Sequence, residues 1–159
     1  MPASLLSGLR DLMHRFGTEF GSTADGGEDD LNVAIAALLY HVVSADGVVT
    51  QAERASLLQV LQDDYAMTGE EADRVARAGE KASDEAVDLY HFTSLIKNRL
   101  DETARIEIVR HLWQVTYADG EVHELEDNVV WRVSELLGVS GRDRMLLKKE
   151  FADRIGAEG

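Results

Sequence analysis

The sequence contains no cysteine. This absence excludes disulfide bonds and catalysis by a thiolate, and it fits a reducing cytoplasm, which is the location we predict. No apolar run approaches the roughly 18 residues that a membrane-spanning helix requires. The N-terminus also lacks the continuous apolar stretch of a signal peptide, so we expect neither secretion nor a transmembrane span.

Basic residues are scarce. The chain has 16 Lys and Arg against 30 Asp and Glu, which gives a formal net charge of -14. Such a surface repels phosphate backbones, so we do not expect nucleic-acid binding. It would attract cations or a protein partner with a basic surface. The alternative interpretation is that the charge only keeps the protein in solution.

The common catalytic motifs are also missing. The sequence has no P-loop, no GxGxxG and no GxSxG. The stretch that starts at His123 begins like the HExxH motif of zinc proteases, but Asp127 occupies the place of the second histidine. We therefore predict no enzymatic activity, and a metal-dependent hydrolase is the least favoured alternative.

From Leu31 onward, apolar residues recur at helical spacing, and no strand-like alternation competes. We predict an all-α fold, a seven-helix bundle over residues 31–155. The helices are expected to begin near Asp30, Thr50, Thr68, Ser83, Asp101, Glu124 and Ser140, and the third to end near Gly79. Large apolar residues on the apolar faces of these helices are Tyr40, Val87, Tyr90, Trp113, Leu125, Trp131, Met145 and Leu146. His41, His91 and His111 are expected to be hydrogen-bonded residues beside those faces.

Two segments precede this bundle. Residues 1–20 carry an apolar stripe and are predicted to form an amphipathic helix, with Leu5, Leu9, Leu12, Met13 and Phe16 on one face. Residues 21–30 are rich in glycine and acidic residues and are predicted to be a flexible linker. The helix would dock on the bundle, on a partner or on a membrane surface.

One loop occurs twice. Ala-Asp-Gly stands at 45–47 and again at 118–120, with a valine two residues after the glycine and a glutamate seven residues after the aspartate. The two aspartates are 73 positions apart, and weaker matches extend the similarity on both sides. We therefore predict two three-helix repeats, about 31–80 and 102–154, related by a pseudo-two-fold axis and joined by a bridging helix at about 84–99.

The acidic residues of these loops have two interpretations. In the first they are structural, because an aspartate suits a tight turn and Glu53 completes a capping box with Thr50. In the second they bind a divalent cation, with Asp46 facing Glu53 in one loop and Asp119 facing Glu126 in the other. The second loop adds two further candidate ligands, Glu121 and His123. Carboxylates favour calcium or magnesium, whereas the imidazole would also admit zinc. The loop is not an EF-hand, because its glycine stands at position two instead of six.

The doubled Ala-Asp-Gly-x-Val-x-x-x-Glu pattern in an acidic helical chain resembles the tellurite-resistance protein B-like (TerB-like) family over residues 31–155. The resemblance implies a seven-helix fold of two three-helix repeats, an acidic surface, a cytoplasmic location and an association with tellurite and general stress responses. It places the family's repeated acidic positions at Asp46, Glu53, Asp119 and Glu126. A related domain occurs in a membrane-anchored DnaJ-like co-chaperone, which implies scaffolding roles.

Two functions follow from these features. The first is a non-enzymatic, stress-associated module that binds a divalent cation or a basic protein partner through the acidic loops. The second is a structural adaptor that contacts a partner or a membrane surface through the N-terminal helix. The oligomeric state cannot be read from the sequence.

Overall fold

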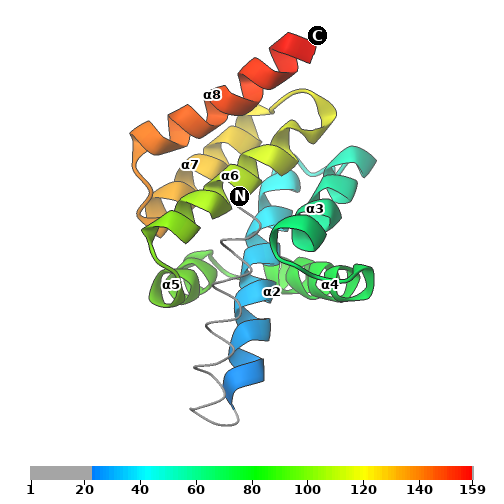
Figure 1. The fold of residues 1–159 in the computed structure, drawn as a ribbon, viewed down its shortest axis with the longest axis vertical. Coiled ribbons are helices and arrows are strands. Elements are labelled where there is room, and N and C mark those ends of the chain that lie inside the picture. The colour runs from blue at the N-terminus through cyan, green and yellow to red at the C-terminus, as the bar shows by residue number, and fades with distance from the viewer. Residues whose placement is uncertain (1–22, 159) are drawn as a thin grey trace.

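The computed structural model describes residues 23–158, so the predicted N-terminal helix lies outside the described residues. Within that range the chain forms seven α-helices and no strand, which confirms the all-α prediction (Figure 1). A short 3-10 turn, η1, precedes the sixth of these helices. The elements in order are α2 (Thr23–Val43), α3 (Gln51–Asp64), α4 (Gly69–Glu85), α5 (Tyr90–Arg99), α6 (Glu102–Thr116), η1 (Tyr117–Asp119), α7 (Glu124–Leu137) and α8 (Gly141–Glu158).

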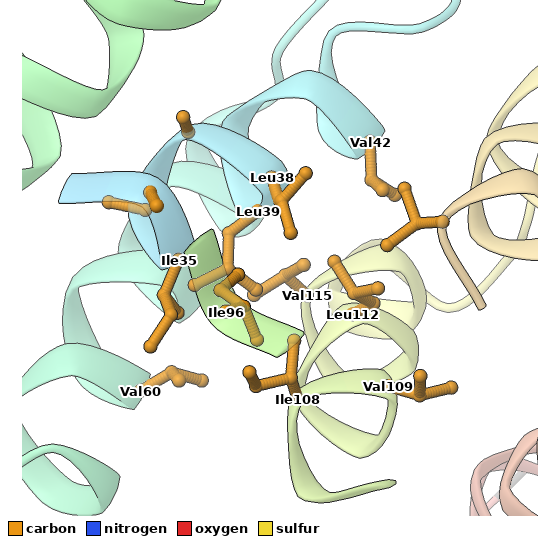
Figure 2. Packing of buried hydrophobic residues seen from close by; sticks show 14 of the residues in the cluster. Ile35, Leu38, Leu39, Val42, Val60, Ile96, Ile108, Val109, Leu112 and Val115 are labelled. Atoms are coloured by element: carbon orange, nitrogen blue, oxygen red, sulfur yellow. The ribbon is translucent and has the colours of Figure 1, made fainter. Parts of the chain in front are cut away.

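Helix α2 is the central element of the bundle. It packs against α4 most extensively and also contacts α3, α5, α6 and α7. Its apolar residues between Leu31 and Val43 are buried, except Val33 and Tyr40, which are half-buried. Figure 2 shows these side chains meeting those of three other helices, with Val60 from α3, Ile96 from α5 and Ile108 from α6 among them. The burial of this helix by several neighbours contributes to the hydrophobic stabilisation of the bundle.

Most predicted helix starts are confirmed. Thr50 and Thr68 both form capping boxes, each accepting the backbone N–H of the glutamate three residues later. Asp101 accepts the N–H of Ala104 at 3.0 Å, and Ser140 Oγ accepts the N–H of Asp143 at 3.1 Å. These contacts satisfy backbone donors that the first turn of a helix otherwise leaves unpaired.

The first described helix begins earlier than predicted. Residues 23–30, which we assigned to a flexible linker, form the first turns of α2. Arg74 of α4 donates a hydrogen bond to Asp29 at 2.9 Å, and Leu31 is buried against the core. Contacts with the rest of the bundle therefore extend the helix through a glycine-containing segment of low intrinsic helix propensity.

The predicted break at Gly79 is wrong. Helix α4 continues through Gly79 and Ser83 to Glu85, and α5 begins only at Tyr90. Gly79 is buried where α4 crosses α2, and a Cβ atom there would lie 2.7 Å from Cβ of Ala36. The glycine thus permits a close helix contact and does not end the helix. Ser83 is not a cap; its Oγ lies 3.3 Å from Nδ1 of His41.

Several residues that we assigned to apolar faces are exposed. Val87 is fully exposed because it lies in the turn between α4 and α5. The others stand on outward positions of helices at the edge of the bundle: Tyr90, Leu125, Trp131, Met145 and Leu146, each between 50% and 66% exposed. Trp113, in contrast, is fully buried, and its Nε1 donates to the carbonyl of Arg144 at 3.1 Å.

A membrane span is not found among residues 23–158, since no helix there is both long and apolar enough to cross a bilayer. The amphipathic segment at 1–20 lies outside this range, so the predicted contact of that segment with a partner or a membrane surface stays a prediction.

Candidate metal centre

The two Ala-Asp-Gly loops have the same local structure. In the loop between α2 and α3, Asp46 Oδ1 accepts the N–H of Val48 at 3.0 Å. At the end of η1, before the loop that leads to α7, Asp119 Oδ1 accepts the N–H of Glu121 at 3.3 Å. The glycine after each aspartate has a positive φ, +85° at 47 and +91° at 120, a conformation that glycine adopts without steric cost. Each aspartate therefore uses one oxygen to hold its turn and keeps Oδ2 for another partner.

The two glutamates are equivalent as well. Glu53 Oε1 accepts the N–H of Thr50 at 2.9 Å, and Glu126 Oε1 accepts the N–H of His123 at 3.1 Å. Both side chains are buried, with 1% and 0% of their surface exposed. The structural role that we assigned to Glu53 is therefore confirmed, and Glu126 makes the same backbone contact beside a histidine.

The loops meet at one end of the bundle, the end opposite the start of α2 (Figure 1). Asp46 of the first loop lies against the second loop, and its Oδ2 is 3.4 Å from Nε2 of His123. One ligand atom each from Asp46, His123 and Glu126 lies within 4.8 Å of the other two. The structure thus groups Asp46 with residues of the other loop, where we had expected it to face Glu53.

The remaining predicted ligands take other positions. Glu53 lies beside Glu126 but outside the three-residue group. Asp119 and Glu121 are exposed, and neither belongs to that group. Their role as ligands stays a prediction. Among residues 28–154, no second group of three His, Asp or Glu residues is brought this close together.

Two buried carboxyl groups lie side by side at this centre. Oε2 of Glu53 and Oε2 of Glu126 are buried, and no N–H or O–H of any residue other than these two glutamates donates to either oxygen. The pKa of Glu126 is raised to about 8, first by burial, then by the hydrogen-bonding contact with Glu53 and by the negative charges of Glu53 and Asp46. The backbone N–H of His123 lowers this pKa in part. Two such carboxyl groups attract each other only when a proton or a cation lies between them.

This donor set fits a divalent cation. It offers carboxylate oxygens from Asp46 and Glu126 and an imidazole nitrogen from His123, held by two rigid turns and the first turn of α7. Buried carboxylates without a counter-charge are costly, and a bound cation would remove that cost. The mixed oxygen and nitrogen set suits first-row transition metals better than calcium or magnesium.

One protein family model matches the part of the chain that contains both acidic loops. The family model described as "Tellurite resistance protein TerB" matches residues 32–149, well over half of the 159-residue chain. The chain belongs to the TerB family. The resemblance drawn from the doubled loop is thereby confirmed. The match begins beyond the predicted N-terminal helix, so the TerB family model covers most of the bundle with both acidic loops and leaves residues 1–31 and 150–159 outside. No curated protein and no solved structure matched the chain.

A second polar cluster of this TerB-family protein lies around His111 on α6, and the sequence patterns did not predict it. His111 on α6 is 1% exposed, and its Nδ1 lies 2.9 Å from the hydroxyl of Tyr65. Its Nε2 lies 3.5 Å from Oδ2 of Asp64. Glu107, one turn before His111, is also buried and pairs with Arg110 at 3.3 Å. The only signal in the sequence is the four-residue spacing of Glu107 and His111 on one face of a helix. The expectation that His111 is a hydrogen-bonded residue beside the core is confirmed.

Proposed function

We propose that this protein is a non-enzymatic, cation-binding module of the TerB family, and that Asp46, His123 and Glu126 hold one divalent cation. The observation that carries the proposal is the group of three ligand atoms within 4.8 Å beside the buried carboxylate oxygens of Glu53 and Glu126, to which no other residue donates. The ion would join a loop from each half of the chain and neutralise charge that the fold buries. Because imidazole takes part, Mn²⁺ and Zn²⁺ are the first ions to test, before Ca²⁺ and Mg²⁺.

Binding can be tested by calorimetric titration of the full chain with Mn²⁺ and Zn²⁺. We expect Asp46→Asn and His123→Gln to weaken binding at least tenfold each, because each removes one direct ligand. Asparagine keeps the Oδ1 acceptor that holds the turn to Val48, so Asp46→Asn removes charge without removing the loop contact. Glu124→Gln is the matched control, since it removes one exposed negative charge next to His123 but lies outside the group. Equal heats for the wild type, Asp46→Asn and His123→Gln would contradict the proposal.

The net charge of the chain indicates what kind of protein partner it would bind. We propose that a protein partner of this module presents a basic surface, because the chain carries a formal net charge of -14. The bound cation would then change the charge of the acidic loops, which form the surface that such a partner would contact.

A further inference from the structure

We propose that the N-terminal segment, residues 1–20, folds back on the bundle and places its apolar stripe in a groove between α2, the end of α4 and the start of α5. Asp30 and Val33 of α2 line this groove, whereas the acidic loops lie at the other end of the bundle (Figure 1). The inference goes beyond the proposed function, and it does not depend on the cation site.

The groove is a cavity of about 560 Å³ with mostly apolar side chains along its walls. Two of the residues that line it, Ala34 of α2 and Phe92 of α5, are buried, whereas Val33 and Leu95 are half-buried. Val87, in the turn between α4 and α5, also lines it and is fully exposed. Contact between these apolar walls and water is unfavourable. Apolar side chains from outside the described bundle would therefore stabilise the fold by filling the groove.

The charges around the groove complement those beside the stripe. Three acidic residues line the groove, Asp30, Glu85 and Asp88, and among the described residues no lysine or arginine lines it. The stripe is flanked by Arg10 and Arg15, with a single aspartate between them. Arginine side chains can pack their stems on apolar surface while the guanidinium reaches a carboxylate. This part of the segment therefore brings positive charge to an acidic rim, in a chain whose formal net charge is -14.

The connection between the stripe and the bundle is long enough for this contact. Residues 17–22 join Phe16, the last residue of the stripe, to Thr23, where α2 begins. An extended connection of this length spans up to about 20 Å. Asp30, the first residue of α2 that lines the groove, lies about 10 Å from Thr23 along the helix. Figure 1 shows the first turns of α2 extending past α4 and α5, so a chain that reverses before Thr23 runs back along α2 towards the groove.

The short connection also favours this segment over a separate partner. It holds the stripe near the groove at an effective concentration of about the millimolar range. A free protein with a similar apolar stripe would have to compete with this tethered segment. Docking would also remove large apolar side chains of the stripe from water, which are Leu5, Leu9, Leu12, Met13 and Phe16.

The first experiment is hydrogen–deuterium exchange of the full chain, measured by mass spectrometry on peptides from residues 5–16. We expect these amides to exchange about tenfold more slowly in the wild type than in Val87→Lys, because the lysine removes an apolar contact and repels the two arginines of the segment. Val48→Lys is the matched control, since Val48 is another exposed valine and lies in the loop between α2 and α3. It should keep the slow exchange. Leu9→Asp, which changes the segment and leaves the groove intact, should exchange as fast as Val87→Lys.

The second experiment locates the segment by cross-linking, which the absence of native cysteine makes specific. Leu9→Cys is combined with Val87→Cys, and the full chain is treated with a short bis-maleimide. We expect a link within one chain, seen as a monomer whose two introduced thiols are joined in the peptide map. Leu9→Cys combined with Val48→Cys is the control and should stay unlinked, because position 48 lies at the other end of the bundle.

Three results would overturn the inference. Exchange of residues 5–16 as fast in the wild type as in Leu9→Asp would show that the segment does not dock and would leave it for a partner or a membrane surface. Slow exchange that Val87→Lys leaves unchanged would place the stripe elsewhere on the bundle. Links between two chains at position 87, in place of links within one chain, would make the segment of a second copy the occupant. None of these results bears on the cation site, which the Mn²⁺ and Zn²⁺ titrations test separately.

Discussion

Replacing Gly79 with alanine is expected to destabilise the protein by about 2–3 kcal/mol, because the added methyl group has no room at the contact between α2 and α4. Its Cβ would lie 2.7 Å from Cβ of Ala36 and 2.8 Å from two backbone atoms, the carbonyl carbon of Ala36 and the nitrogen of Ala37. Real side chains do not approach so closely, and backbone atoms cannot rotate away. The central helix would have to move from the partner with which it packs most extensively.

The helix propensity of alanine acts in the opposite direction. In an exposed helix, glycine to alanine stabilises by about 1 kcal/mol, so the measured loss is the clash minus this gain. Gly69→Ala is the matched control on the same helix, since nothing lies within 4 Å of a Cβ at that position. Urea unfolding of both variants gives the comparison. If Gly79→Ala is as stable as Gly69→Ala, the contact between α2 and α4 is not as tight as the structure has it.

Acid is expected to destabilise the protein through His111. Burial lowers the pKa of His111 to about 3, and the positive charge of Arg110 adds to the shift. An unfolded histidine has a pKa of about 6.5, so between pH 6.5 and 3 the unfolded chain binds a proton that the folded chain does not. The contribution of His111 to the free energy of unfolding therefore falls as the pH falls through this range, by up to about 1.4 kcal/mol per pH unit. Above pH 6.5 the contribution of His111 is complete and constant. Glu126 contributes in the opposite direction below pH 8, because its raised pKa makes the folded state bind the proton more firmly than the unfolded chain.

The neighbours of His111 change the size of this effect but not its sign. His41 has a pKa lowered by burial and acts in the same direction. Asp64 acts in the opposite direction, because burial and then the charges of Asp63 and Glu107 raise its pKa, so the folded state holds that proton more firmly. Tyr65 does not titrate in this range, since burial raises its pKa well above 10.

The measurement is urea unfolding at pH 7.0 and pH 5.0 for the wild type and His111→Gln. We expect the change in the free energy of unfolding from pH 7.0 to pH 5.0 to be about 2 kcal/mol less favourable in the wild type than in His111→Gln, because only the wild type has the buried imidazole. His91→Gln is the control, because His91 is an exposed histidine of α5 and does not belong to the cluster around His111. A variant that loses as much stability as the wild type would show that another group governs the response to acid.

Sequence patterns predicted the features that depend on near neighbours in the chain. The capping boxes at Thr50 and Thr68 are formed by residues three positions apart, so their spacing alone is informative. The same is true of the two loops, in which each aspartate accepts the N–H of the residue two positions later. Helical periodicity likewise identified most of the buried residues of α2 and α6.

Periodicity was less informative at the edge of the bundle. Trp131 and Trp113 both lie at helical spacing with other apolar residues, yet Trp131 is 52% exposed and Trp113 is fully buried. Helix α6 has neighbours in α2, α3, α7 and α8, so much of its surface is covered. Helix α7 also has four neighbours, α2, α5, α6 and α8, but they cover only the face with Glu126, Val130, Val133, Ser134 and Leu137 and leave Trp131 outside. Which faces of a helix its neighbours cover is a property of the packing and not of its own sequence.

The sequence by itself therefore determined the helical class, most of the helix starts and the conformation of both acidic loops, because each rests on hydrogen bonds and contacts within one turn. Only the tertiary structure decided which carboxylates meet. Asp46 lies with His123 and Glu126 because the packing of the helices brings together loops that are far apart in the chain. The same packing buries Glu53 and Glu126 side by side and makes Gly79 a point of helix contact instead of a break. Such long-range pairings depend on how whole helices are arranged, and local patterns carry no record of that arrangement.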